Sequence, residues 1–396
     1  MKLVRTFHPV GHGAFYTERF YDDKEENVAN IVFDCGCYEW TAKGEKKRDF
    51  IKEINAVVDQ EFPVLDEKTK IDALFISHFH TDHINGIPNL LQNCDVQRVI
   101  MPKLTDEAYM QSIMYSHFVL GVDLNESLET LEQFKDAIRY GEEGNNIIEV
   151  EIDEDDISSD GVFDNIDLKE LQSPISKSTI LTLFSAKWKY VPFSTKERKQ
   201  QLLNALKQGV LALCPALSKV PVDFKSIATQ LINQPSLLDQ CKLIYKSVFG
   251  GKRYHNSYSM TLFSGTCESH STCALQCHLN LKDLPRYCTK NCIYMGDFEA
   301  DPKISRKNTN CNQFLKFYDK FWRRVGLFQV PHHGSHDNVN VALYSPAKIA
   351  IISAGKNDAY SHPHLDVIAD LQKHNCIPII VTESSSTMQQ YIYNIF

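Results

Sequence analysis

The pattern of apolar and polar residues predicts short strands and helices in alternation near both ends of the chain. Apolar runs rich in strand-forming residues lie at 30–36, 71–76 and 96–101. Residues 45–60 instead repeat apolar side chains at helical spacing, with charged residues between them. Strand patterns return in the last third of the chain, where one helix is expected over 365–374. Alternation of this kind is typical of an α/β protein.

The middle of the chain, residues 104–250, has a different pattern. Four stretches in it are predicted to be helical: 106–140, 195–208, 223–232 and 237–248. Residues 141–172 carry twelve Asp or Glu against a single Lys. Such a block is typical of a solvated surface segment, and a metal-binding or DNA-mimicking role is the alternative. We expect 104–250 to be one large, mostly helical insertion into a domain made of residues 1–103 and 251–396.

The strand at 71–76 ends in a group of potential metal ligands, Ser77 to His83, with the sequence SHFHTDH. In extended backbone His78 and His80 point to the same side, because side chains alternate with period two. Asp82 and His83 lie just beyond and can turn toward a neighbouring position. Imidazole and carboxylate ligands suit zinc-like or manganese-like ions. Exposed loop histidines are the alternative, which the density of His and Asp in this segment disfavours.

Other predicted strands also end in potential ligands. These are Asp297, the pair His332 and His333, and His362 with His364. Because α/β folds place their chemistry at the carboxyl ends of strands, we expect these side chains to line one rim of a sheet. A carboxylate such as Asp297 could bridge two cations there. Asp34, at the end of another strand, either caps a turn or orients a ligating His.

Composition narrows the possible functions. A net charge of −8 argues against a broad basic surface for duplex DNA, although a local basic groove or a small phosphorylated substrate remains compatible. The first residues lack the apolar core of a signal peptide, and no apolar run reaches the length of a membrane span. The twelve Cys are therefore expected to be reduced thiols in the cytoplasm. The Cys between 267 and 292 match no common zinc spacing, and a structural zinc there is the alternative.

The His-x-His-x-Asp-His motif after a strand resembles the signature of the metallo-β-lactamase superfamily. An ordered set of motifs is most similar to the ComEC-like branch, the metallo-hydrolase domain of bacterial DNA-uptake channel proteins. The set consists of Val10 to Ala14, Phe33 to Gly36, Ser77 to His83, Asn256 to Ser259, Gly296–Asp297, Pro331 to Ser335 and His362 to His364. The resemblance covers about 1–103 and 251–396. It implies a four-layer αβ/βα sandwich with a metal site at one edge of its two sheets.

The resemblance also implies roles for individual residues. By position, the metal ligands are His78, His80, Asp82, His83 and Asp297, with Asp297 bridging two ions. The usual third His of the superfamily, between the first motif and the bridging Asp, is absent, and Asn256 and Ser259 stand in its place. Similarity to a phosphorylcholine esterase branch favours His333 as a ligand and His332 as the group that faces the substrate. His362 and Asn256 are candidates for substrate binding or as alternative metal ligands.

From this we expect a metal-dependent hydrolase, with a phosphodiesterase or nuclease favoured. Two divalent cations, Zn²⁺ or Mn²⁺, would lie about 3.5–4 Å apart and hold a bridging hydroxide between them. Asp82 would hold one metal and orient the water, and His332 would donate a proton to the developing charge or the leaving group. A phosphodiester is the expected substrate, with single-stranded nucleic acid as one candidate. Trp188–Tyr190 and Lys252–His255 could supply the basic and aromatic contacts that strand binding needs, although ordinary core packing and surface charge are the favoured interpretation of these segments.

Two other functions remain open at this point. An acyl hydrolase for a lactone, thioester or β-lactam would use the same fold, but such sites usually retain the third His that is missing here. A metal-stabilised interaction module would instead bind a protein partner through residues 104–250. The complete ligand set disfavours that reading, because it makes loss of catalysis less expected.

Overall fold

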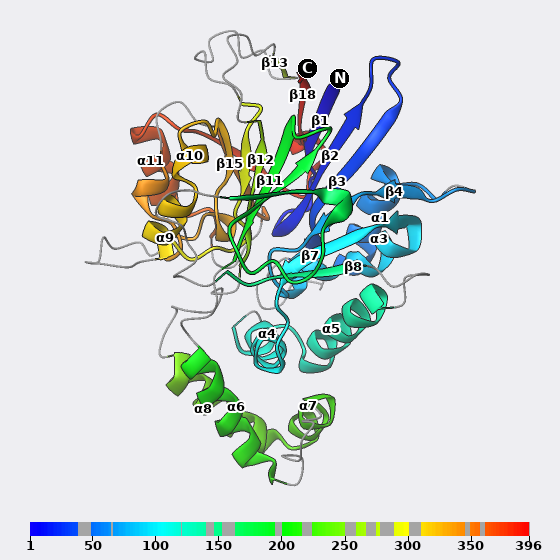
Figure 1. Cartoon of the computed structure of the whole chain (residues 1–396). Coiled ribbons are helices and arrows are strands. Elements are labelled where there is room, and N and C mark those ends of the chain that lie inside the picture. The colour runs from blue at the N-terminus through cyan, green and yellow to red at the C-terminus, as the bar shows by residue number, and fades with distance from the viewer. Residues whose placement is uncertain are drawn as a thin grey trace.

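The computed structural model describes most of the chain, in ranges separated by short gaps. These ranges are 1–38, 49–64, 66–119, 121–139, 146–152, 163–194, 200–215, 224–249, 259–266, 275–277, 289–300, 310–344, 349–356 and 361–395. Two sheets of eight strands each face one another at its centre (Figure 1). A further small sheet pairs β4 (Thr69–Ile71) with β6 (Cys94–Val96). Among the described residues, no helix has the length and apolar content needed to span a bilayer.

The first sheet is built mainly from the N-terminal part of the chain. Its order is β13 (Leu275–Cys277), β18 (Gln389–Asn394), β1 (Lys2–Phe7), β2 (Gly13–Tyr21), β3 (Asn27–Cys37), β5 (Ala73–Phe75), β7 (Arg98–Pro102) and β8 (Asn146–Val150). The strands from β3 to β8 run parallel, whereas those from β13 to β3 are antiparallel. Parallel strands align their carboxyl ends, so the loops after β3 and β5 meet at one edge.

The second sheet comes from the later part of the chain. Its order is β17 (Ile377–Val381), β16 (Ile349–Ser353), β15 (Leu327–Gln329), β14 (Cys292–Tyr294), β12 (Thr261–Gly265), β11 (Trp188–Phe193), β10 (Thr179–Leu183) and β9 (Asp164–Asp167). The strands from β14 to β17 are parallel. Their carboxyl ends carry the second half of the predicted ligand set.

Helices cover the outer faces of both sheets and complete the four layers. The first sheet is covered by α1 (Phe50–Glu61), α3 (Ile87–Asn93), α4 (Asp106–Phe118) and α5 (Leu124–Arg139). The second is covered by α9 (Asn310–Phe317), α10 (Asp319–Trp322) and α11 (Leu365–Lys373). The α1 helix forms as its pattern predicts: Phe50, Ile54 and Val58 are buried, and Asp49 caps its N-terminus by accepting from Lys52 N. The predicted four-layer α/β sandwich is confirmed.

The core between the sheets is largely aromatic. The Phe33 and Tyr294 rings stack with centroids 4.9 Å apart, and Tyr16 stacks on Tyr294 at 5.7 Å. A fully buried ion pair lies in the same layer, where Arg5 Nη2 is 2.7 Å from Glu18 Oε1. These contacts hold the two sheets at a fixed spacing, and the loops at their common edge depend on that spacing.

The expected insertion over 104–250 differs from the structure in one respect. Four strands within it, β8 to β11, pair in the two sheets. They divide the helical residues into two separate blocks. The α4 and α5 helices form the crossover between the parallel strands β7 and β8, whereas α6 (Gln200–Leu213), α7 (Phe224–Asn233) and α8 (Pro235–Phe249) connect the antiparallel neighbours β11 and β12. These strands were not predicted, because a short polar strand such as β9 produces only a weak period-two pattern in an acidic segment. The boundaries at 103 and 251 stay a prediction.

Candidate metal centre

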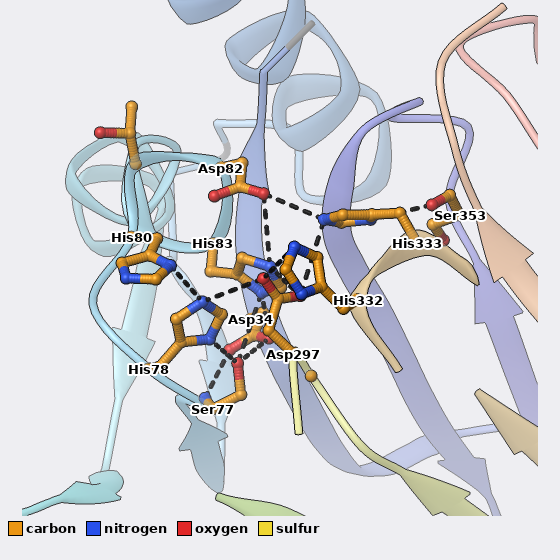
Figure 2. A network of polar contacts seen from close by, with 12 residues as sticks. Asp34, Ser77, His78, His80, Asp82, His83, Asp297, His332, His333 and Ser353 are labelled. Atoms are coloured by element: carbon orange, nitrogen blue, oxygen red, sulfur yellow. Dashed lines mark hydrogen bonds and ion pairs between the residues drawn. The ribbon is translucent and has the colours of Figure 1, made fainter. Parts of the chain in front are cut away.

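Seven of the predicted site residues lie together at the edge where the parallel strands of both sheets end (Figure 2). The loop after β5 and the short helix α2 (Thr81–Ile84) carry four of them, His78, His80, Asp82 and His83. Asp297 follows β14, and His332 and His333 follow β15 in a short 3₁₀ turn. Six of the seven are at most 4% exposed, and His332 is the more open one, with its side chain 17% exposed.

The first group of ligand atoms is formed by His78, His80 and Asp297. His78 Nε2 and His80 Nδ1 face each other at 2.9 Å, and Asp297 Oδ2 lies 3.5 Å from His78 Nε2. All three ligand atoms lie within 4.8 Å of one another, close enough to contact one ion.

The second group contains Asp82, His83, Asp297 and His333. His333 Nε2 lies 3.1 Å from Asp82 Oδ2 and 3.6 Å from Asp297 Oδ1. His83 Nε2 lies 3.2 Å from Asp297 Oδ1 and 3.5 Å from Asp82 Oδ2. Asp297 thus belongs to both groups, with Oδ2 toward the first and Oδ1 toward the second. This is the arrangement expected of a carboxylate that bridges two cations.

Hydrogen bonds orient three of the four clustered imidazoles from behind. His83 Nδ1 lies 2.8 Å from Asp34 Oδ2, and His78 Nδ1 lies 2.9 Å from Ser77 Oγ. His333 Nδ1 donates to the Ser353 carbonyl at 2.9 Å, which leaves Nε2 directed at the second group. Such bonds select the tautomer and fix the ring plane of ligating histidines.

Asp34 also ties the motif to β3. It accepts from Ser77 N and Ser77 Oγ, both at 2.6 Å, besides its contact with His83. The two alternatives left open for Asp34 therefore coincide, because one carboxylate both caps the loop backbone and orients a histidine.

The backbone of the site requires glycine at two positions beside Asp82. A Cβ on Gly13, which has a φ of +131°, would lie 2.5 Å from Asp82 O. A Cβ on Gly36 would lie 2.6 Å from the same carbonyl. Both distances are well below van der Waals contact, so β2 and β3 approach the motif only because these residues have no side chain. His332 and His333 themselves have positive φ angles of 48° and 54°, a strained conformation that is frequent at functional sites.

The electrostatics of the second group favour a positive charge. Burial lowers the pKa of His83, but the nearby carboxylates of Asp82, Asp297 and Asp34 outweigh it and raise that pKa well above the usual value. For His333 the same balance of burial against the Asp297 and Asp82 carboxylates also gives a raised pKa. A position that stabilises protonated imidazoles so strongly is one where a bound cation would be stabilised too.

A buried carboxylate oxygen also supports a bound cation here. Asp82 Oδ1 is buried and forms no hydrogen bond within the described part of the chain. Leaving such an atom unsatisfied is costly, and metal coordination would satisfy it. The donor set, imidazole nitrogens with two carboxylates, fits divalent ions such as Zn²⁺ or Mn²⁺.

His332 differs from the other imidazoles. Burial lowers its pKa to about 4 although Asp297 opposes the shift, so this imidazole is neutral near pH 7. Its Nε2 lies 3.9 Å from Asp297 Oδ2, beside the first group rather than inside it. This position agrees with the expected assignment of His333 to the ligand set and of His332 to the substrate side, an assignment that stays a prediction.

The remaining predicted residues lie at different places. The His362 ring is 6.0 Å from that of His332, at the rim of the centre. Asn256, Lys252–His255 and the Cys at 267, 273 and 288 fall outside the described residues. Trp188 and Tyr190 are fully buried between the sheets, where they donate hydrogen bonds to Ser264 and Glu18. The core packing favoured for these two residues is therefore confirmed, and the alternative, contact with a nucleic-acid strand, is excluded for them.

Three contacts were not predicted from the sequence. Ser259 Oγ accepts from Asp297 N at 2.9 Å and so positions the shared carboxylate. The His12 ring packs 3.9 Å from that of His333, although His12 was noted only as part of a glycine-flanked motif. The Tyr115 ring stacks on His80 at 4.0 Å. No sequence signal identifies Tyr115, because it lies in the helical middle of the chain.

Comparisons with known proteins find local similarity. A curated relative, ribonuclease J of Mycoplasma genitalium, is 28% identical over 93 residues, which are 24% of this chain and 14% of the relative. ComE operon protein 3 of Bacillus subtilis is 38% identical over 68 residues, 17% of this chain and 9% of the relative. The chain therefore matches only a small part of either protein's length. Among solved structures, the Rm3 metallo-beta-lactamase matches with 11% identity and a TM-score of 0.25, covering 82% of this chain and 76% of that one.

A family model covers the part of the chain that carries the motif. The model described as the metallo-beta-lactamase superfamily matches residues 27–163, from β3 through the ligand loop and beyond β8. The match includes His78 to His83 and ends inside the segment that was expected to be an insertion. Together with the order of the motifs and the buried His and Asp cluster, it places a metallo-β-lactamase superfamily domain in this chain.

Proposed function

We propose that the protein is a metal-dependent phosphodiesterase that acts on nucleic acid, with single strands favoured. The observation that carries the proposal is the pair of ligand groups that share Asp297. Two cations held side by side can act on both the attacking and the leaving oxygen of a phosphodiester. The local similarity to proteins named ribonuclease J supports a nucleic-acid substrate over a small acyl compound.

In this proposal each of the two groups of ligand atoms binds one cation. His78, His80 and Asp297 would hold one cation, and Asp82, His83, His333 and Asp297 the other. When bound, the cations would lower the pKa of water toward ~7 and offset charge on the phosphoryl oxygens.

The other side chains would act on the substrate. His332 is neutral at pH 7 and more open than the ligands, so it can donate a hydrogen bond to a substrate oxygen. His362 lies at the rim and would contact the substrate beyond it. Asp82 Oδ1, which has no hydrogen-bond partner in the described ranges, would orient a water in addition to the part of Asp82 in the ligand set.

The cellular setting of this activity is part of the proposal. The cysteines Cys35, Cys94, Cys214, Cys241 and Cys292 are buried and free. Free thiols support a reducing compartment such as the cytoplasm. A protein partner that binds through residues 104–250 remains an expectation.

The test measures hydrolysis of bis-p-nitrophenyl phosphate and of labelled single- and double-stranded DNA and RNA. The protein is loaded with Mn²⁺ or Zn²⁺ and compared with its His80→Ala and Asp82→Ala variants. We expect cleavage that requires metal and falls about 100-fold or more in both variants, since each removes a ligand. His374→Ala, a partly buried histidine at the end of α11, serves as the matched control and should keep full activity.

Other outcomes would redirect the assignment. Two bound ions without diester cleavage would contradict the phosphodiesterase, and lactone and thioester substrates would then be tried. Turnover of an acyl substrate would establish the acyl hydrolase. No turnover of either class would leave the metal-stabilised interaction module.

A further inference from the structure

His80 is held differently from the other imidazoles of the metal centre. His78, His83 and His333 each have their outer ring nitrogen bonded by Ser77, Asp34 or Ser353. His80 uses Nδ1 toward His78, and its Nε2 forms no hydrogen bond within the described ranges. Rotation about the bond between Cβ and an imidazole ring has a broad energy profile, so a ring without such a bond needs another restraint.

The restraint is the ring of Tyr115 on α4. The Tyr115 and His80 centroids are 4.0 Å apart and the planes differ by 13°, so the rings lie face to face. Both are nearly buried, with 3% and 2% exposure. The next residue of α4, Ser116, accepts from Thr81 Oγ1 at 3.5 Å, so the helix follows the motif over two consecutive positions.

The backbone of Tyr115 is itself firmly held. Residues 108–116 of α4 are buried around the whole helix, because α5 packs on one side and α6 on another. A helix enclosed in this way has little freedom to shift. The plane of the Tyr115 ring is therefore fixed, and it restricts the orientation of the His80 imidazole stacked on it.

We propose that Tyr115 is a positioning residue of the metal centre, which sets the plane of His80 so that Nδ1 points at the ion shared with His78. The inference rests on the proposed metal site but not on the identity of the substrate. It also assigns the β7–β8 crossover a part in metal binding, although every ligand comes from other segments.

The experiment measures metal binding rather than turnover. Protein freed of metal with a chelator is titrated with Zn²⁺ against a chromophoric chelator, and the visible absorption of the Co²⁺ form reports the ligand geometry. Tyr115→Leu removes the flat ring, whereas Tyr115→Phe keeps it. Tyr109→Leu is the matched control, since it removes another buried tyrosine of α4 at the end of the helix away from His80. Thermal unfolding and circular dichroism confirm that each variant is folded.

We expect wild type to bind two ions and Tyr115→Leu to bind one of them about 10–100-fold more weakly, with an altered Co²⁺ spectrum. Tyr115→Phe and Tyr109→Leu should match wild type in both measurements. If Tyr115→Leu does not fold, Tyr115→Met replaces it, because Met fills more of the volume without a flat face. A folded Tyr115→Leu or Tyr115→Met with wild-type affinities and spectrum would overturn the inference.

The two proposals fail in distinguishable ways. Wild type that binds two ions without cleaving diesters would contradict the proposed function and leave the Tyr115 measurement decisive. Wild type that binds no ion would overturn both.

Discussion

At the scale of single residues, the site combines strained backbone with saturated hydrogen bonds. Asp34 has a φ of +53°, in the left-handed region that costs most residues energy and that Asp and Asn tolerate best. Its carboxylate nevertheless accepts two bonds from Ser77 and contacts His83. A residue held in this conformation with this many partners is expected to act through the groups it orients.

Replacing Asp34 by Asn tests that role. Asp34 Oδ1 accepts from Ser77 N, and Oδ2 contacts both the Ser77 hydroxyl and His83. Asn keeps the preference for left-handed backbone, but its amide nitrogen cannot accept a hydrogen bond, so it loses one of these two sets of contacts. We expect the affinity for one of the two ions to fall about 10–100-fold, as measured by chelator competition. Asp23→Asn, on the exposed turn of the same hairpin, is the control. Unchanged affinity for both ions in Asp34→Asn would show that His83 needs no orienting carboxylate.

The sequence was most informative at this scale. Ligands that follow predicted strands could be grouped because parallel strands bring their carboxyl ends to one edge. That reasoning grouped His78 to His83 with Asp297 and with the pair His332 and His333. The family resemblance then favoured His333 as the ligand of that pair. Ser259 lay in one of the motifs, but its hydrogen bond with Asp297 was not predicted. Tyr115 could not be found, because it has no distinctive residue type or spacing and reaches the site only through packing.

At the scale of elements, helices were easier to predict than their places in the fold. The pattern over 106–140 indicated one helix, and the structure has α4 and α5, with Gly121 at a φ of +66° between them. The α4 helix is buried on all sides because α5 and α6 pack against it. The periodicity of the α4 sequence alone could not predict this burial. The strands β8 to β11 were missed because they are short and lie in or beside the acidic segment.

An ion pair between α4 and α6 provides a test at this scale. Lys207 Nζ lies 2.7 Å from Glu107 Oε1. Burial would raise the pKa of Glu107, but the hydrogen bond from Lys207 outweighs it and the net shift is downward. A lowered carboxyl pKa contributes stability that is present above the unfolded value of about 4.3 and lost as the pH falls below it.

We therefore expect Lys207→Met to reduce the free energy of unfolding by about 0.2–1 kcal/mol at pH 7, a range typical of solvent-accessible pairs. The difference from wild type should shrink as the pH falls from about 5 to about 3, measured by urea unfolding. Lys242→Met removes a charge from exposed α8, where the described residues include no ion partner, and should have little effect. An equal loss at both pH values would mean that Lys207 acts through packing of its aliphatic stem.

At the scale of the whole molecule, a polar network joins the two sheets. Glu18 on β2 accepts from Tyr190 on β11 and Tyr294 on β14, at 2.8 and 2.7 Å. Arg5 on β1 pairs with Glu18 and donates to the Lys290 carbonyl at 2.8 Å. On the sequence alone, a charged residue in an alternating strand is predicted to face water. Here both charges face the other sheet, so the network could not be predicted without the layers.

Breaking this pair should affect global stability. Arg5→Met leaves the Glu18 carboxylate buried without its cation and should lower the free energy of unfolding by about 3–5 kcal/mol in urea titrations. The double variant Arg5→Met/Glu18→Leu removes both charges and should recover part of the loss. The exposed pair of Lys2 and Glu25 offers the contrast, with about 0–1 kcal/mol expected for Lys2→Met. A loss for Arg5→Met no greater than for Lys2→Met would show that the carboxylate is neutralised or solvated in the variant.

The connection between β11 and β12 has a consequence for how this fold can diversify. The two strands pair as directly as the arms of a tight hairpin, yet residues 194–260 and three helices lie between them. The entropy of closing a loop grows only with the logarithm of its length, so each doubling costs about 0.6 kcal/mol. Lineages can therefore lengthen, shorten or exchange this connection at little thermodynamic cost. The pairing of β11 with β12 sets the register of the sheet, so the strand ends that carry the ligands stay in place while the connection changes.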